Sequence, residues 1–219
     1  LDSYLSKSVI GTRALSSVLV KGKTDGSGIK VTTYNITYCT TGMYQNALAT
    51  AGIEDAEIVV AGPYNISGTA ALVGAIKSYE NMTGETVSQE NVDTATNELV
   101  VTGKLAESVG DSDKAEQLVG AVKEQVVEGS DNGKKLTEEE IGNVVDQAAQ
   151  EMDVQLSDED RQEIVDLMDK IKGLDIDVDS LKEQAKDLYD KIDDLGLKLD
   201  WNQEKVQGFF SKIIEFFKN

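Results

Sequence analysis

Strand-like patterns of apolar and polar positions are confined to the first third of the chain. Residues 14–20 alternate loosely and end in β-branched side chains, and residues 29–39 are rich in β-branched residues, so both segments predict β-strands. Residues 21–28 between them consist of Gly, Lys, Thr, Asp and Ser and predict a turn. Together the three segments predict an antiparallel hairpin.

A third strand is predicted by the nearly continuous apolar run at residues 57–61. A short run of this kind is typical of a strand that is central in its sheet and buried. Gly62 and Pro63 follow directly and should end this strand.

Helices are predicted before and after this third strand. Thr40 or Thr41 suits the N-cap of a helix that runs to residue 50 and ends at Gly52. Ser67 should cap a second helix, which carries apolar residues at helical spacing from residue 72 to residue 79. The order of elements over residues 10–79 is therefore β-β-α-β-α.

From residue 88 onward the spacing of apolar residues is helical. Gly110 and Gly173 mark expected helix ends. The expected N-terminal caps and capping boxes are Ser88, Asp113 with Glu116, Thr137 with Glu140, Ser157, and Asp200 with Gln203. Helices that are short and well capped favour a compact bundle over a long coiled coil.

The predicted fold class is therefore α+β, with a small N-terminal β-β-α-β-α layer followed by a mostly helical C-terminal region. We expect two parts, an α/β domain at residues 1–84 and a helical region at residues 85–219. The polar loop at residues 129–135 marks an expected sub-boundary, at 129–136, within the helical region.

The charge of the chain narrows the range of its partners. Its 219 residues include 21 Lys and Arg and 40 Asp and Glu, which is a formal net charge of −19. So acidic a protein repels phosphate backbones, and we expect no nucleic-acid partner; anionic membrane surfaces are disfavoured for the same reason. The sequence contains no apolar run long enough for a transmembrane helix.

The residue types that are missing narrow the chemistry. The chain has no His, which removes the commonest general base and metal ligand and the Ser-His-Asp and Cys-His pairs. Its one cysteine, Cys39, has no internal disulfide partner, and we expect it to be a small buried hydrophobic residue. We therefore expect no metal site and no cofactor, and we assign no catalytic residue, although paired carboxyl groups are able to do acid–base work.

Two features of the strand-bearing stretch are candidate ligand sites. Ser67, Gly68 and Thr69 stand where a strand is followed by a helix, and the free amides at a helix start attract anions. Arg13 is one of two arginines, and its guanidinium suits a carboxylate or phosphate ligand. The structural alternatives are a strand-to-helix turn for the first feature and an ion pair for the second.

Residues 200–219 predict an amphipathic helix with a wide apolar face. Such a helix suits the groove of a partner protein or weak peripheral contact with a membrane. The alternative is that it closes the helical bundle. The residues expected on this face are Trp201, Phe209, Phe210, Ile213 and Phe217.

Seven segments carry an ordered series of short motifs: IGTRALSS at residues 10–17, GSGIKV at 26–31, NIT at 35–37, MYQNALATAG at 43–52, AGPYNISGTAALVGAIKSYE at 61–80, NELVVTGKL at 97–105 and, in the helical C-terminal part, DLMDKIKGLDIDVDSLKEQ at 166–184. In this order they resemble the YpuA-like proteins, secreted proteins of unknown function found mainly in Firmicutes (domain of unknown function 1002). Members of that family carry a signal peptide and a further N-terminal segment, so we expect this chain to be a trimmed part of a longer protein. The resemblance implies secretion or attachment to the cell envelope, and it supplies no activity.

These observations favour an exported, non-catalytic binding or interaction module at the cell envelope, whose partner is an envelope component or protein. The alternative is a carboxylate-based hydrolase that acts on a cell-wall glycan or peptide through two carboxyl groups in a cleft. A further alternative is a protein that adsorbs to surfaces through its C-terminal amphipathic helix.

Overall fold

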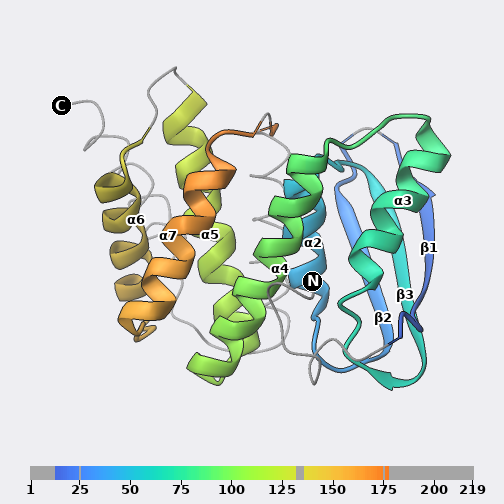
Figure 1. Ribbon diagram of the computed structural model, residues 1–219, viewed down its shortest axis with the longest axis horizontal. Coiled ribbons are helices and arrows are strands. Elements are labelled where there is room, and N and C mark those ends of the chain that lie inside the picture. Colours follow the sequence, from blue (N-terminus) through green and yellow to red (C-terminus); the bar gives the residue numbers. More distant parts are fainter. Residues whose placement is uncertain (1–12, 25, 132–135, 175, 178–219) are drawn as a thin grey trace.

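The structure is a computed structural model that describes residues 13–24, 26–131, 136–174 and 176–177 of the chain. A small sheet lies at one end of the molecule, and a group of helices lies at the other end (Figure 1). Three strands and two helices come first along the described chain, and four more helices follow. The predicted α+β fold class, with its N-terminal β-β-α-β-α layer, is confirmed.

The sheet consists of β1 (Ser17–Gly22), β2 (Ile29–Ile36) and β3 (Ala56–Ile66). β3 is the central strand; it runs antiparallel to β1 and parallel to β2. The predicted hairpin of the first two strands is therefore wrong, whereas the central position of the third strand is confirmed. Residues 58–61 of β3 are apolar on both faces of the sheet, and a strand of this kind loses most contact with water in the central position.

β3 continues past Gly62 and Pro63, so the predicted end of this strand is wrong. Pairing with β1 stops at Ala61, and pairing with β2 is interrupted until Ile66. Pro63 therefore lies where the sheet needs no hydrogen bond from its nitrogen. A proline is tolerated in a strand at such a position because it lacks the N–H group.

The helix predicted after β2 is α2 (Thr41–Thr50). Thr40 is its N-cap, as predicted, and the Thr40 hydroxyl accepts a hydrogen bond of 3.0 Å from the amide of Met43. Nine of the ten residues of α2 are buried, because this helix lies between the sheet and the helical region.

The next helix, α3 (Ala71–Thr83), begins later than predicted. Its N-cap is Ala70, which makes no side-chain hydrogen bond, so the predicted capping by Ser67 is wrong. The carbonyl of Ser67 accepts a hydrogen bond of 3.1 Å from the amide of Cys39, and Gly68 then turns the chain with a φ of +89°. Ser67 therefore belongs to the edge of the sheet layer and not to the helix.

Four helices make up the rest of the described chain: α4 (Gln89–Val109), α5 (Ser112–Asp131), α6 (Glu138–Glu151) and α7 (Asp158–Ile171). The predicted N-caps of α4, α6 and α7 are confirmed at Ser88, Thr137 and Ser157. None of the described helices is long and apolar enough to cross a membrane. The helix predicted at residues 200–219 lies outside the described residues.

The capping box predicted for α5 is wrong. The carboxylate of Asp111, one residue before the helix, accepts hydrogen bonds from the amides of Asp113 (3.1 Å) and of the next residue (3.0 Å). The Glu116 carboxylate instead accepts a hydrogen bond from the Thr40 hydroxyl and joins α5 to the start of α2. α5 extends to residue 131, so the first residues of the loop expected at 129–136 are helical.

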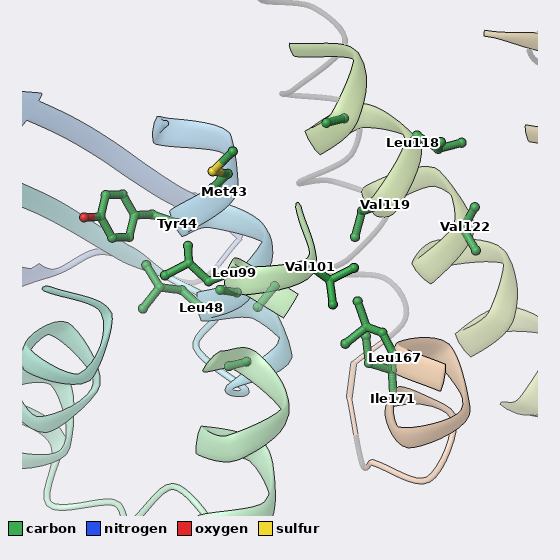
Figure 2. Packing of buried hydrophobic residues seen from close by; sticks show 14 of the residues in the cluster. Met43, Tyr44, Leu48, Leu99, Val101, Leu118, Val119, Val122, Leu167 and Ile171 are labelled. Atoms are coloured by element: carbon green, nitrogen blue, oxygen red, sulfur yellow. The ribbon is translucent and has the colours of Figure 1, made fainter. Parts of the chain in front are cut away.

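The buried apolar residues form one continuous cluster in which α4 is central. Figure 2 shows that Leu99 of α4 lies beside Leu48 of α2. Val101, also in α4, faces the other way, toward Leu167 of α7. This cluster includes residues from both sides of position 84. The division expected at that position stays a prediction.

Candidate functional site

The predicted anion site at the start of α3 is a closed turn. The carbonyl of Gly68 accepts hydrogen bonds from the amide of Ala71 (2.9 Å) and from the hydroxyl of Tyr44 (2.6 Å). Thr69 is buried and Ser67 is half-buried. These contacts fix the path of the chain between the sheet and α3, and anion binding by the three residues stays a prediction.

Arg13, the other predicted ligand residue, is exposed and precedes β1. Within the described part of the chain it forms no ion pair, and no hydrogen bond joins it to the start of α3. The two predicted ligand sites are therefore not linked by such a bond, and binding of an acidic ligand by Arg13 stays a prediction.

Cys39 is a structural residue. Its exposed fraction is 3%, and burial raises the pKa of its thiol to about 12, although a hydrogen bond with the Tyr44 side chain acts in the opposite direction. The thiol is therefore protonated at neutral pH, and a protonated thiol is a poor nucleophile.

A buried ion pair, which the sequence pattern did not reveal, joins the three innermost helices. Nζ of Lys123 in α5 lies 2.9 Å from a carboxylate oxygen of Glu98 in α4, and both side chains are almost fully buried. The same Nζ donates to the carbonyl of Asn46 (2.8 Å) and to the hydroxyl of Thr50 (3.2 Å) in α2. The Thr50 hydroxyl donates in turn to the second oxygen of Glu98 (2.5 Å). The ion pair is thus satisfied internally, which indicates a structural role.

The turn between β1 and β2 binds a carboxylate of the chain itself. One oxygen of Asp55 accepts hydrogen bonds from the amides of Ser27 (2.6 Å) and Gly28 (2.8 Å), and the other accepts from Gly26 (2.9 Å). Consecutive amides that converge in this way form a nest for an anion. Burial acts to raise the pKa of Asp55, but the hydrogen bonds from Gly26, Gly28 and Ser27 outweigh it and hold this pKa below its ordinary value. The sequence predicted that this turn closes a β1–β2 hairpin. Its hydrogen bonds to Asp55 instead fix the β1–β2 connection beside the start of β3.

One face of the sheet is covered and the other is open. α3 packs on β1 and α2 packs on β2, and on that side Ile58 and Val60 are fully buried. On the other side Leu19 exposes 66% of its surface and Tyr34 exposes 58%. Val59 lies between their strands, opposite Leu19 in the register. We call this side the open face; its residues are Ser17, Leu19, Lys21, Lys30, Thr32, Tyr34, Glu57, Val59 and Ala61.

The open face differs in charge from the helical region. Nζ of Lys21 and Nζ of Lys23 lie 3.6 Å and 4.0 Å from a carboxylate oxygen of Glu57. Lys30 of β2, which is opposite Glu57 in the register, is also exposed. Basic side chains therefore outnumber acidic ones at this end of the open face. In contrast, residues 85–177 contain 25 acidic and 8 basic residues, whereas residues 13–84 contain five of each. The open face combines an apolar centre with a basic end on an otherwise acidic protein.

A groove lies where the α/β layer meets the helical region. It consists of two depressions of about 460 Å³ and 550 Å³ that share Glu90 and Gly173. Tyr79 of α3 and the link from α3 to α4 line the first depression. Residues of α4 and of the end of α7 line the second. Figure 1 shows this end of α7 running toward the start of α4. We call the two depressions the junction groove. Its charged lining residues are Glu85, Glu90, Asp93, Asp169 and Lys170.

Comparison with known proteins identifies a protein family that the chain matches. A family model described as "Protein of unknown function (DUF1002)" matches residues 1–188. The chain is 39% identical over 184 residues to "Uncharacterized protein YpuA" of Bacillus subtilis (strain 168). That alignment covers 84% of this chain and 62% of the relative, so the chain spans less than two thirds of the relative's length. No solved structure matches the chain.

Proposed function

The chain belongs to the DUF1002 family of proteins of unknown function, and from this premise we propose that it is a non-catalytic binding module of the cell envelope whose open face docks a partner protein. The observation that carries the proposal is the exposure of Leu19 and Tyr34 on the uncovered side of the sheet. Large apolar side chains that gather on an uncovered face are typical of contact sites for other proteins.

The chemistry of the open face defines the partner. Leu19, Val59 and Tyr34 supply an apolar centre, and a tyrosine at such a place offers both a large apolar ring and a hydroxyl. Lys21 and Lys30 lie at one end of this centre. The matching partner is therefore a protein that presents an apolar surface flanked by acidic residues.

Affinity capture from a cell-envelope extract tests this proposal. The bait proteins are the wild type, the face variant Leu19→Ser/Tyr34→Ser, and the control variant Val73→Ser/Met82→Ser, which removes exposed apolar side chains from α3. We expect the wild type and the control to retain the same partner and the face variant to lose it. The purified partner should bind the face variant at least about tenfold more weakly, because a few central anchors carry most of the affinity of an interface.

Each variant removes only exposed side chains, so unfolding by denaturant should agree with the wild type to within about 0.5 kcal/mol. Equal retention by the face variant and the wild type would contradict the assignment of the open face. A partner lost by the control variant but kept by the face variant would move the contact site to α3.

The charge of the open face has its own test with the same purified partner. The variant Lys21→Glu/Lys30→Glu reverses two exposed charges. We expect it to slow association and to weaken the dependence of the association rate on salt, because charges at the rim of an interface act mainly on the rate of encounter. Unchanged association kinetics would contradict an acid-flanked partner.

The location at the cell envelope is part of the proposal and rests on the resemblance to secreted proteins described above. Fractionation of cells that produce the full-length protein, followed by detection in cytoplasm, envelope and medium, tests it. Detection in the cytoplasm alone would contradict the location.

One observation favours the alternative of a carboxylate-based hydrolase, namely the acidic lining of the junction groove. Glu90 belongs to both depressions, so it is the first carboxyl group to test. Release of reducing ends or free amines from cell-wall glycan or peptide, lost in Glu90→Gln, would support a hydrolase and contradict a non-catalytic module. The alternative of surface adsorption rests on residues 200–219, outside the described part, and stays a prediction.

A further inference from the structure

The outer edge of β1 pairs with no other strand in the described part of the chain, because β3 is the middle strand of the sheet. In an antiparallel pair, residues that bond the partner strand alternate with residues whose amide and carbonyl point away from it. The amide of Lys23, directly after β1, donates a hydrogen bond of 3.3 Å to the carbonyl of Asp55, directly before β3. Counted back in steps of two, the odd-numbered residues of β1 bond β3. The amides and carbonyls of Val18 and Val20 therefore point outward.

The outer edge of β2 differs, because it is partly covered and irregular. The side chain of Gln45 in α2 donates a hydrogen bond of 2.7 Å to the carbonyl of Ile29. The register of β2 with β3 shifts at Asn35, which has a φ of +56°. Covered groups and irregular register protect a strand edge from pairing with another chain. β1 keeps an unbroken register with β3 over all its residues, so its edge is the one suited to accept a further strand.

Apolar side chains flank the edge of β1 on both faces of the sheet. Leu19 exposes 66% of its surface on the open face. Val18 and Val20 point to the covered face and are half-buried. The flank of α3 beside them is small, since a Cβ at Gly74 would lie 3.4 Å from a methyl carbon of Val18 and Ser78 follows one turn later. A strand added here gains apolar contacts as well as hydrogen bonds.

The same edge lies at the end of the molecule that carries little net charge. Figure 1 shows β1 on the side of the sheet that faces away from the helical region. Residues 13–84 contain five acidic and five basic residues. Two copies that each carry a net charge of −19 repel one another, and contact through this end keeps their acidic regions farthest apart. The charge distribution therefore favours this end for contact between copies.

We propose that β1 pairs antiparallel with β1 of a second copy of this chain, so that two three-stranded sheets join into one. The twofold axis passes beside Leu19. Val18 exchanges both outward hydrogen bonds with Val20 of the second copy, and Leu19 meets its own equivalent in a non-hydrogen-bonded pair, where side chains are closest. Lys21 lies opposite Ser17, so no like charges meet. The contact uses the same strand of both copies and closes as a dimer.

This dimer leaves the open face uncovered, because the two strands join edge to edge. The open faces of both copies lie on the same side of the joined sheet. The inference goes beyond the docking of a partner protein and does not rest on it, since the purified chain self-associates with no partner present. Loss of docking and loss of self-association are therefore separate results.

Sedimentation equilibrium of the purified whole chain, from about 5 µM to about 500 µM, tests the proposal, because a contact of one strand pair is small and weak. Leu19→Lys places two like charges beside the twofold axis. Tyr34→Lys is the matched control, since Tyr34 is similarly exposed on β2 and the change in net charge is the same. We expect the wild type and the control to dimerise alike and Leu19→Lys to dimerise at least about tenfold more weakly.

Salt gives a second readout on the same samples. We expect the wild-type dimer to become tighter as salt rises, because screening reduces the repulsion between two copies of charge −19. Both substituted side chains are exposed, so the midpoint of denaturant unfolding should stay that of the wild type. An unchanged midpoint shows that weaker dimerisation of Leu19→Lys comes from the contact and not from loss of the fold.

A disulfide across the axis tests the register. The Cα atoms of a non-hydrogen-bonded pair lie about 4.5 Å apart, which is within the range of a disulfide. With oxidised glutathione as the oxidant, Leu19→Cys should form a covalent dimer at least about tenfold faster than Tyr34→Cys. The native Cys39 does not compete, because its exposed fraction is 3%.

Three results would overturn the proposal. The first is a wild-type chain that stays monomeric over the whole concentration range. The second is equal weakening by Leu19→Lys and Tyr34→Lys, which would move the contact away from the β1 edge. The third is equal rates of covalent dimer formation by the two Cys variants, which would indicate random collision of exposed thiols.

Discussion

At the scale of single residues, two glycines show separately what a left-handed backbone requires and what close packing requires. Gly68 has a φ of +89°, and a Cβ at this position would lie 2.5 Å from the Tyr44 hydroxyl and 2.6 Å from a methyl carbon of Ile36. Gly84 has a similar φ of +80°, but a Cβ there would meet open space. The two positions therefore share the backbone requirement, and Gly68 alone adds close packing.

We expect Gly68→Ala to lower the free energy of unfolding by roughly 2–4 kcal/mol, because it combines a left-handed backbone with a steric clash. Gly84→Ala should lower it by about 1–2 kcal/mol through the backbone alone. Denaturant unfolding of both variants measures the difference. Equal losses would show that the contacts of Gly68 relax without strain.

Asp55 predicts a dependence of stability on pH. Its pKa is lowered in the folded protein, so its contribution is fully present above the ordinary pKa of about 3.9 and is lost as the pH falls through the lower folded value. At pH 7 we expect Asp55→Asn to lower the free energy of unfolding by roughly 1–2 kcal/mol, a modest value for hydrogen bonds to a half-exposed charge.

Unfolding of the wild type and Asp55→Asn across the acid range measures this linkage. The difference between the two proteins should be constant near neutral pH and should disappear in strong acid. Glu57→Gln is the control, because its ion pair with Lys21 is exposed and should contribute less than about 0.5 kcal/mol. A difference that persists in strong acid would contradict the role of the Asp55 charge.

At the scale of elements, α5 shows how a helix with many polar residues becomes buried on every side. Residues 115–127 of α5 are buried on every side, although they include Lys123, Glu124 and Gln125. Apolar residues at helical spacing with charged residues between them usually indicate a helix with one exposed face. In α5 the charged side is covered instead by α2 and α4, where Lys123 meets Glu98.

We expect Lys123→Met to lower the free energy of unfolding by about 3–5 kcal/mol, because it leaves the Glu98 carboxylate buried without its cation. The double variant Lys123→Met/Glu98→Met should recover most of that loss, since it leaves no uncompensated charge. Lys104→Met breaks the partly exposed pair with Glu163 and should cost at most about 1 kcal/mol. A double variant no more stable than Lys123→Met would contradict this account.

At the scale of the whole molecule, the buried apolar cluster is continuous, whereas the charged residues are unevenly distributed between the sheet layer and the helical region. Buried residues from β3, α2, α4, α5 and α7 belong to one cluster. The acidic residues are concentrated in the helical region, and the open face lies in the nearly neutral layer at the other end. The molecule therefore presents two different surfaces on a shared core.

Because the core is shared, we expect the sheet layer and the helical region to unfold together. Native-state hydrogen exchange in increasing denaturant measures this: the buried amides of Ile58 in β3 and Leu167 in α7 should reach the same opening free energy. An opening of β3 at a clearly lower free energy would favour the independent α/β domain at residues 1–84 that the sequence predicts.

The amino-acid sequence alone determined much of the local structure of this protein. The β-branched residues at positions 29–39 and the apolar run at residues 57–61 predicted β2 and β3, and Thr40, Ser88, Thr137 and Ser157 predicted four helix starts. These features depend on neighbours within a few positions, because strand alternation has a period of two residues and a cap bonds an amide about three residues away. The absence of His from the sequence also excluded the catalytic and metal-binding sites that need an imidazole.

Only the tertiary structure decided how these pieces meet. The order β1-β3-β2, the use of Glu116 to bond Thr40, and the closed turn at Gly68 depend on contacts between residues that are far apart in the chain. The open face is shared by three strands, and the junction groove draws on residues from α2 to α7. No local period relates such residues, because their distance in space is set by the packing of the whole core.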